Sequence, residues 1–143
     1  MMLKSSIRRP SVMIGVALAM MLFSATPASA ASSTAGRENF YRNCDAVLAV
    51  SDQTTPGSVE VYGGWGCDAT SYFYPGQIIL SLYLNGVEVK HSEKKTPDLS
   101  RPQSFSHAVT HPDYSTTDYF YGKMTIKGAG GVNFTLTTGN IRT

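Results

Sequence analysis

The sequence has few of the residues on which catalysis and metal binding depend. It holds three histidines and two cysteines in 143 residues, and no serine lies in a G-x-S-x-G elbow. His107 and His111 are four positions apart, but their segment favours a strand, where four residues span about 13 Å and one metal ion cannot contact both. The sequence therefore indicates no enzyme, no cofactor and no metal site.

Helical patterns and repeats are missing as well. After residue 31, no long stretch places apolar residues at the 3.6-residue period of a helix, and no segment is repeated. The apolar run within residues 11–23 is shorter than the roughly 20 residues needed to span a bilayer. We therefore expect this run not to serve as a stable membrane anchor.

The N-terminal segment predicts export. Its first ten residues carry three basic side chains and no acidic one, the apolar run follows, and the small residues Ala28, Ser29 and Ala30 end it. This order is typical of a secretory signal peptide. We expect cleavage after Ala30, which divides the chain into a signal peptide (residues 1–30) and a single secreted domain (residues 31–143).

Removal of the signal peptide changes the charge of the protein. The whole chain has a formal charge of +2, which includes the three basic residues of the leader, so the remaining domain carries −1. A nearly neutral domain is not drawn to nucleic acid or to an anionic membrane surface by its net charge. We therefore expect no nucleic-acid partner.

Both cysteines, Cys44 and Cys67, lie in the exported part, 23 positions apart. Thiols of an exported protein meet oxidising conditions, and two cysteines without a nearby histidine make a poor zinc site. We expect a disulfide between them. At this spacing it would stabilise the fold by about 3 kcal/mol in the loop-entropy model.

Short runs of β-branched and aromatic residues, separated by turn residues, predict a series of strands. The clearest signal is Asn85-Gly86, a dipeptide typical of two-residue hairpin turns. The hairpin would put Leu82 opposite Val89 and would leave His91 on the apolar face. The predicted strands cover residues 46–51, 58–62, 71–74, 77–84, 87–93, 104–110, 118–127 and 132–138.

The strand pattern favours an all-β domain. Half-apolar antiparallel strands bury their apolar sides by packing as two sheets, so we expect a small β-sandwich of immunoglobulin-like architecture with one disulfide. A small β-barrel is the alternative. Residues 31–36 are small and polar and are expected to fray. The glycines at 63, 64 and 66 indicate a bulge or a tight bend around Trp65.

Aromatic residues supply the candidate binding face. Tyr83, Tyr119 and Tyr121 fall on the polar side of predicted strands, where rigid amphipathic rings can bind a sugar or a protein. Cross-strand packing is the alternative role for these tyrosines. Trp65 is a further candidate, although a tryptophan next to a cysteine is more typical of a plug beside a disulfide.

Export, small size and the missing catalytic motif favour a secreted interaction protein. It would bind an extracellular protein or a cell-envelope component, as an inhibitor or antibacterial factor does, through the tyrosines or the loops at 94–103 and 111–117. The alternative is a carbohydrate- or cell-wall-binding module, for which coplanar exposed tyrosine rings would be the sign. A matrix subunit would instead have unpaired edge strands that can add a further strand.

Overall fold

The computed structural model describes residues 31–97, 104–114 and 117–143, and these form nine β-strands and one short 3-10 turn. The predicted signal peptide lies outside the described residues. No helix in the described part is long and apolar enough to cross a membrane. The elements are β1 (Ser32–Tyr41), β2 (Cys44–Ser51), β3 (Ser58–Cys67), β4 (Gly76–Leu84), β5 (Val87–Lys95), β6 (Ser104–Pro112), β7 (Tyr119–Gly128), η1 (Ala129–Gly131), β8 (Val132–Thr137) and β9 (Ile141–Arg142).

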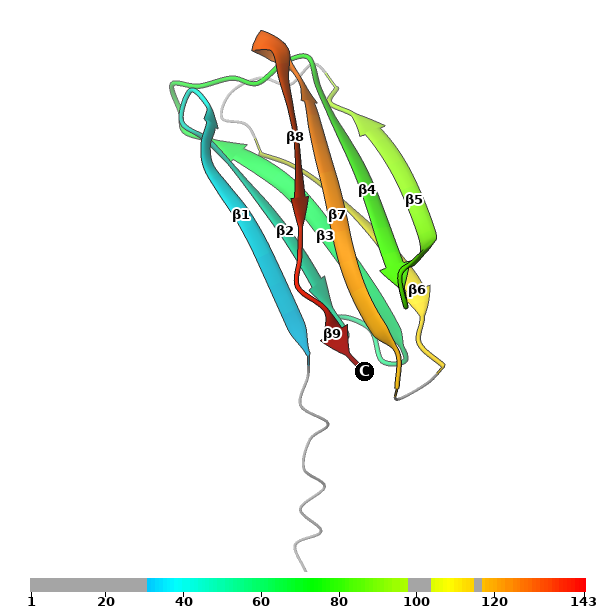
Figure 1. Ribbon diagram of the computed structural model, residues 1–143. Helices are drawn as coiled ribbons and strands as arrows, with labels where there is room; N and C mark the ends of the chain where they lie inside the picture. Colours follow the sequence, from blue (N-terminus) through cyan, green and yellow to red (C-terminus); the bar gives the residue numbers. More distant parts are fainter. Residues whose placement is uncertain (1–30, 98–103, 115–116) are drawn as a thin grey trace, which may run out of the picture.

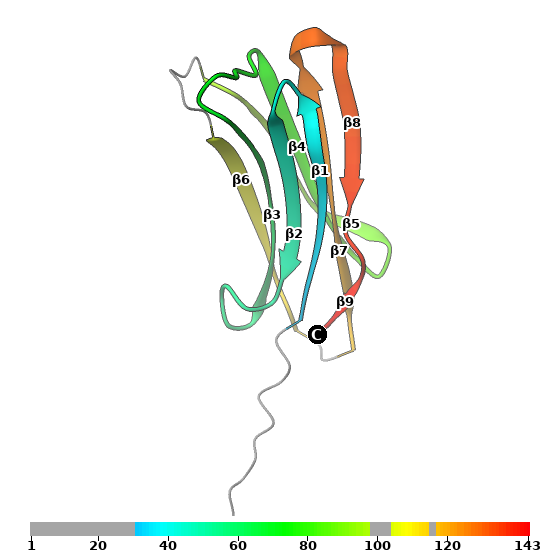
Figure 2. The same ribbon diagram turned by 90° about the vertical axis from the view of Figure 1, so that its left-hand side faces the viewer.

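The strands form two antiparallel sheets that pack face to face (Figure 1). One sheet has the order β1-β2-β3-β6, and the other has the order β5-β4-β7-β8, with β9 pairing the start of β7. Figure 2 shows the two layers from the side. The predicted β-sandwich is therefore confirmed. The alternative of a barrel is wrong, because each sheet ends in its own edge strands, β1 and β6 in one and β5 and β8 in the other.

The core lies between the sheets because apolar residues alternate along the strands that line it. In β2 and β3 the fully buried residues include Leu48, Val50 and Val61. Removal of these apolar side chains from water is the main favourable term in folding. The facing strands β4 and β7 contribute Ile78, Leu80, Leu82, Phe120, Met124 and Ile126, all with no exposed surface.

The predicted disulfide is present. Cys44 begins β2, Cys67 ends β3, and the two lie directly opposite each other, joined by an S–S bond of 2.02 Å. The strands predicted at residues 46–51 and 58–62 lie within β2 and β3, which pair antiparallel. The disulfide therefore closes the open end of this hairpin, at the point where the chain leaves the sheet.

The glycines around Trp65 do not form the predicted bend. β3 pairs with β2 over residues 60–67 and with β6 over residues 58–66, in both cases without a register shift. Glycine is needed there for a different reason, because a methyl group on Gly63 would overlap the sulfur of Met124 in the facing sheet. Gly122 in β7 is placed against Val61 of β3 in the same way. These two glycines allow the sheets to approach closely at the centre of the sandwich.

Residues 71–74 are not a strand, contrary to the prediction from the sequence. They belong to the connection that crosses from β3 in one sheet to β4 in the other, and the Phe73 side chain is fully buried. Its ring packs edge-on against Trp65 and Phe40, with ring centroids 5.2 and 5.1 Å away. The aromatic pattern of this segment therefore reflects a side chain that closes one end of the core.

The hairpin turn at Asn85-Gly86 is present, but the register slips by one residue beyond it. Val89 forms a bulge, so Leu82 lies opposite Lys90 instead of Val89. A bulge adds one residue to one strand, and each side chain beyond it changes face. As a result His91 lies on the outer face of the sheet and not on the predicted apolar face.

We expect Gly63→Ala to destabilise the domain by about 1–3 kcal/mol, as overpacking of a core does. The added methyl group would meet the Met124 sulfur and lie 3.1 Å from Leu80. Gly66→Ala is the control, because a methyl group at Gly66 has no neighbour within 4 Å. Urea unfolding of both variants measures the effect, and equal midpoints would contradict the close approach of the sheets.

Candidate functional site

Two of the predicted tyrosines lie together on the outer face of the five-stranded sheet. Tyr83 of β4 and Tyr121 of β7 are cross-strand partners, and their rings stack with 4.7 Å between centroids and 7° between planes. Both side chains are half-buried. Burial raises the pKa of the Tyr83 hydroxyl, and the nearby Glu88 carboxylate raises it further. The Tyr83 hydroxyl therefore remains neutral at physiological pH.

Cations sit beside these rings. The Lys123 Nζ lies 4.9 Å from the centroid of Tyr83 and 5.8 Å from that of Tyr121. Tyr119 is 47% exposed on the same side of β7, with the Arg142 guanidinium 5.8 Å from its ring centroid. Such cation–ring contacts are worth about 0.5–1 kcal/mol each at exposed sites. Below, the term tyrosine face means Tyr83, Tyr119, Tyr121 and Lys123.

Trp65 does not belong to this face. It is 3% exposed and lies in the core, where its ring contacts Phe105 and Phe73 with centroids 4.9 and 5.2 Å away. Trp65 is also two residues from Cys67 in the same strand. Trp65 is therefore a core residue that packs near the disulfide, as the alternative interpretation expected. It is not part of an exposed binding face.

The two loops predicted as alternative binding surfaces are shorter than expected. β5 extends to Lys95 and β6 extends to Pro112, so parts of both segments belong to strands. Residues 98–103 and 115–116 lie outside the described residues. Between them, Tyr114 is 88% exposed and is the most exposed large apolar side chain of the described residues.

A polar network that the sequence pattern did not predict lies next to the tyrosine pair. The Ser81 hydroxyl is 3.1 Å from Nδ1 of His91, whose Nε2 is 3.4 Å from Oε1 of Glu93. Glu88 Oε1 is 3.6 Å from the same Nδ1. The Ser81 hydroxyl lowers the pKa of the Glu88 carboxyl, and the Tyr83 hydroxyl lowers it further. The Val89 bulge creates this network, because it puts His91 opposite Ser81.

A serine, a histidine and a carboxylate also make up the triad of many hydrolases, so the chemistry of this network needs a test. A nucleophilic serine must be open to substrate and lie near N–H donors that stabilise an oxyanion. Ser81 is only 6% exposed, and its strand is paired on both sides, so the neighbouring N–H groups bond within the sheet. The network therefore orders the side chains of the outer face and does not provide a nucleophile.

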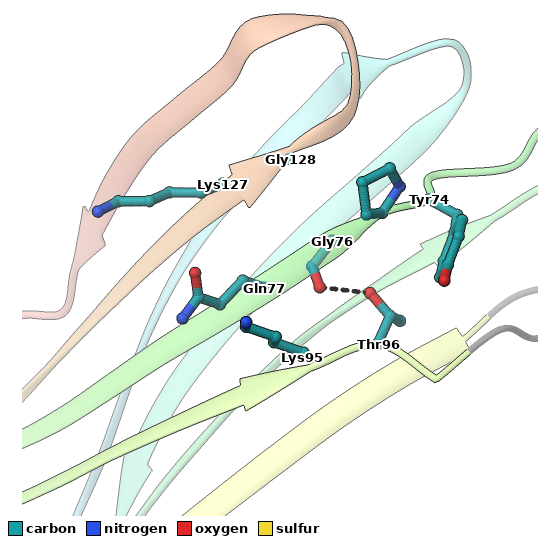
Figure 3. Close-up of a pocket in the computed structure, with 8 residues that line it drawn as sticks. Tyr74, Gly76, Gln77, Lys95, Thr96, Lys127 and Gly128 are labelled. Atoms are coloured by element: carbon teal, nitrogen blue, oxygen red, sulfur yellow. Dashed lines mark hydrogen bonds between the residues drawn. The ribbon is translucent and has the colours of Figure 1, made fainter.

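A pocket of about 330 Å³ lies at the end of β4 opposite to the tyrosine pair (Figure 3). Lys95 and Lys127 are the two cross-strand partners of Gln77, so two ammonium groups flank one amide. The Thr96 hydroxyl donates to the Gly76 carbonyl at 2.5 Å and holds the rim. The Gln77 amide nitrogen donates to the Glu93 carboxylate at 3.0 Å, so a carboxylate lies beside the pocket although none lines it. The lining residues are Tyr74, Pro75, Gly76, Gln77, Lys95, Thr96, Lys127 and Gly128.

The two histidines of β6 each have their own partner. His107 Nε2 lies 2.7 Å from the Ser92 hydroxyl of β5, and His111 Nδ1 lies 2.6 Å from the Pro112 carbonyl. Within the described ranges, no group of three or more His, Cys, Asp or Glu side chains is arranged to hold a metal ion. Burial lowers the pKa of His107, and the ammonium group of Lys94 lowers it further.

Comparisons with known proteins give little further guidance. No protein-family model matches the chain, and no curated protein sequence matches it significantly. A crystal structure described as the ApaA protein from Bordetella pertussis is similar to this chain, with 12% identity and a TM-score of 0.35. That match covers 78% of this chain and 89% of the other. A similarity at this level assigns neither a family nor a function.

We expect His107 to make folding stability fall under mildly acidic conditions. The unfolded chain takes up a proton at this imidazole near pH 6.5, whereas the folded chain takes it up only at lower pH. Stability therefore decreases as the pH falls below about 6.5. Urea unfolding at pH 7.5 and pH 5.0 should show a smaller loss for His107→Gln than for the wild type. Equal losses in the two proteins would contradict the lowered pKa.

Proposed function

We propose that this protein is a secreted, non-enzymatic interaction protein that binds an extracellular protein or a cell-envelope component through the tyrosine face. Its role is that of an inhibitor or an antibacterial factor, in which recognition is the activity. The observation that carries this proposal is the tyrosine face itself, an aromatic and cationic surface on the outer side of the five-stranded sheet.

Two features support export. The Cys44–Cys67 disulfide is of the kind that persists outside the reducing cytoplasm. The backbone nitrogen of Ala31 donates to the Asp52 carboxylate at 2.8 Å. Cleavage after Ala30 would turn this nitrogen into a positively charged α-amino group, and the hydrogen bond would become an ion pair. The predicted cleavage site and the start of the folded domain are therefore compatible.

The chemistry of the tyrosine face suits a protein partner. Tyrosine and arginine are enriched among the residues that dominate binding energy at protein interfaces, because they offer large rigid area together with hydrogen-bonding groups. Tyr119, the first residue of β7, and Arg142 of β9 are cross-strand neighbours. Tyr83 and Tyr121 are held in place by their stacking, so little side-chain entropy would be lost when a partner binds.

The arrangement of the rings is less suited to a carbohydrate. A sugar stacks on the open face of an aromatic ring, and several such rings would need to lie in one plane. Tyr83 and Tyr121 instead cover each other, and Lys123 occupies a position over the Tyr83 ring. The pocket beside Gln77, which Lys95 and Lys127 help to line, could hold a charged group of an envelope polymer. The experiment below therefore includes a polysaccharide arm.

We expect Tyr121→Ser to weaken partner capture at least about tenfold, which corresponds to the loss of one residue that dominates binding. The immobilised wild-type domain is used to capture proteins from culture supernatants and envelope extracts. Tyr62→Ser is the matched control, because Tyr62 is 42% exposed on the other sheet. Lys123→Glu provides a second variant that preserves the stacked rings.

The proposal requires capture that survives Tyr62→Ser and fails in both Tyr121→Ser and Lys123→Glu. Capture that is insensitive to all three variants would exclude the tyrosine face. Sedimentation of the domain with insoluble cell-wall polysaccharide, without capture of any protein, would instead favour the carbohydrate-binding alternative.

A further inference from the structure

The four sheet edges differ in how they are protected from further pairing. β5 has the Val89 bulge and carries three lysines and two glutamates, β1 has a register shift between Arg37 and Tyr41, and β8 has only six residues. Bulges, charges and short length are the usual means of preventing edge-to-edge pairing. β6 has none of these: it is nine residues long, pairs without a register shift, and turns small uncharged residues outward, namely Ser104, Ser106, Ala108 and Thr110.

The backbone of β6 presents its free hydrogen-bonding groups in a regular series. The Asp113 nitrogen donates to the Gly57 carbonyl at 2.9 Å, just beyond the Ser58–Pro112 pair that begins the ladder between β3 and β6. Odd-numbered residues of this strand are therefore the ones that bond to β3. In an antiparallel ladder, the residues of one strand alternate between bonding to the neighbour and facing away. The even-numbered residues 104–110 therefore turn their N–H and C=O groups to the open edge. Pro112, which has no N–H, falls in the same series.

Cationic side chains of β5 lie along the inner side of this edge. Lys90 and Lys94 are opposite the buried residues Leu82 and Ile78, so they point from β5 toward the facing sheet. The Ser92 hydroxyl, on the same side of β5, contacts His107 of β6 at 2.7 Å. A strand added to β6 would place every second side chain beside these two lysines.

Neither lysine is neutralised in the described part of the chain. The ion pairs of the described residues belong to His91, which is on the other side of β5. Lys94 is close enough to His107 to lower its pKa. A second copy of this chain would bring its own Lys90 and Lys94 to the same edge and add like-charge repulsion. An acidic strand would remove the charge imbalance.

We propose that β6 is a docking edge for an extended acidic segment of a partner protein, which binds by strand addition. The segment continues the four-stranded sheet with about eight backbone hydrogen bonds, one donor and one acceptor from each of four residues. Its alternate acidic side chains face Lys90 and Lys94, and its other side chains lie over Ser106 and Ala108. This inference rests on the proposed function only in taking the partner to be a protein.

Two synthetic peptides test the inference directly. Acetyl-(Thr-Glu)4-amide and acetyl-(Thr-Lys)4-amide are titrated into the ¹⁵N-labelled domain, and amide shifts are followed by NMR. We expect the acidic peptide to shift the amides of Ser106 and Ala108 and to bind about tenfold more tightly than the basic one, since it would form exposed ion pairs with Lys90 and Lys94 where the basic one would be repelled. Lys90→Glu/Lys94→Glu should reverse this preference. Arg37→Glu, an exposed residue of β1 at the opposite edge of the same sheet, is the control and should leave it unchanged.

Backbone pairing is tested separately from charge. Ala108→Pro removes an N–H that faces the open edge and none that bonds to β3, so it should abolish binding of the acidic peptide while the domain remains folded. Ser106→Lys, which adds an edge charge, is a second variant in case the proline unfolds the strand.

Equal binding of both peptides, shifts that do not map to β6, or binding that persists in both variants would overturn the inference. Concentration-dependent dimers of the wild type that Ser106→Lys abolishes would show that a second copy occupies the edge, which would also overturn it. Partner capture that depends on Tyr121 but is unaffected by Ser106→Lys would leave the proposed function in place and refute only the docking edge.

Discussion

The close approach of the two sheets at Gly63 and Gly122 is the constraint on which the rest of the structure depends. A methyl group at either position would overlap a side chain of the facing sheet, Met124 or Val61, so the packing there would have to shift. The interior is therefore packed throughout, with Phe73 closing one end and the Cys44–Cys67 disulfide joining the strands beside it. A small domain packed in this way has little room for a deep internal site, so we look for a binding site on its outer faces and edges.

The same packing explains why the polar side chains are where they are. The inner sides of β4 and β7 are apolar, and the outer sides carry tyrosines, lysines and the Ser81 hydroxyl. The Val89 bulge gives β5 a different pattern, because it turns Lys90 toward the facing sheet and His91 outward. One extra residue thereby creates both the polar network beside the tyrosine face and the positive charge beside β6.

Much of the fold could be predicted from local signals. Asn85-Gly86 specifies a turn through backbone geometry, and two cysteines leave one possible pairing, so both features were predicted correctly. The bulge at Val89 could not be predicted, because an alternating sequence fits either register. In the structure the bulged register brings the Ser92 hydroxyl to 2.7 Å from Nε2 of His107 in β6. The expected fraying of residues 31–36 was wrong for a similar reason: β1 pairs with β2, although its small residues carry no strand signal of their own. Trp65 and residues 71–74 have the composition of an exposed strand or binding surface, and their burial became apparent only from the tertiary arrangement.

We propose that this chain works outside the cell as a processed, oxidised recognition domain. Intact-mass analysis of the protein in the medium of a secreting bacterium that expresses the full chain tests this most directly. The account predicts a species that begins at Ala31 and is two hydrogens lighter than the reduced chain, because Cys44 and Cys67 are joined. It also predicts alkylation of both thiols only after reduction. A cell-associated product that retains residues 1–30, or a secreted one whose cysteines are alkylated without reduction, would contradict it.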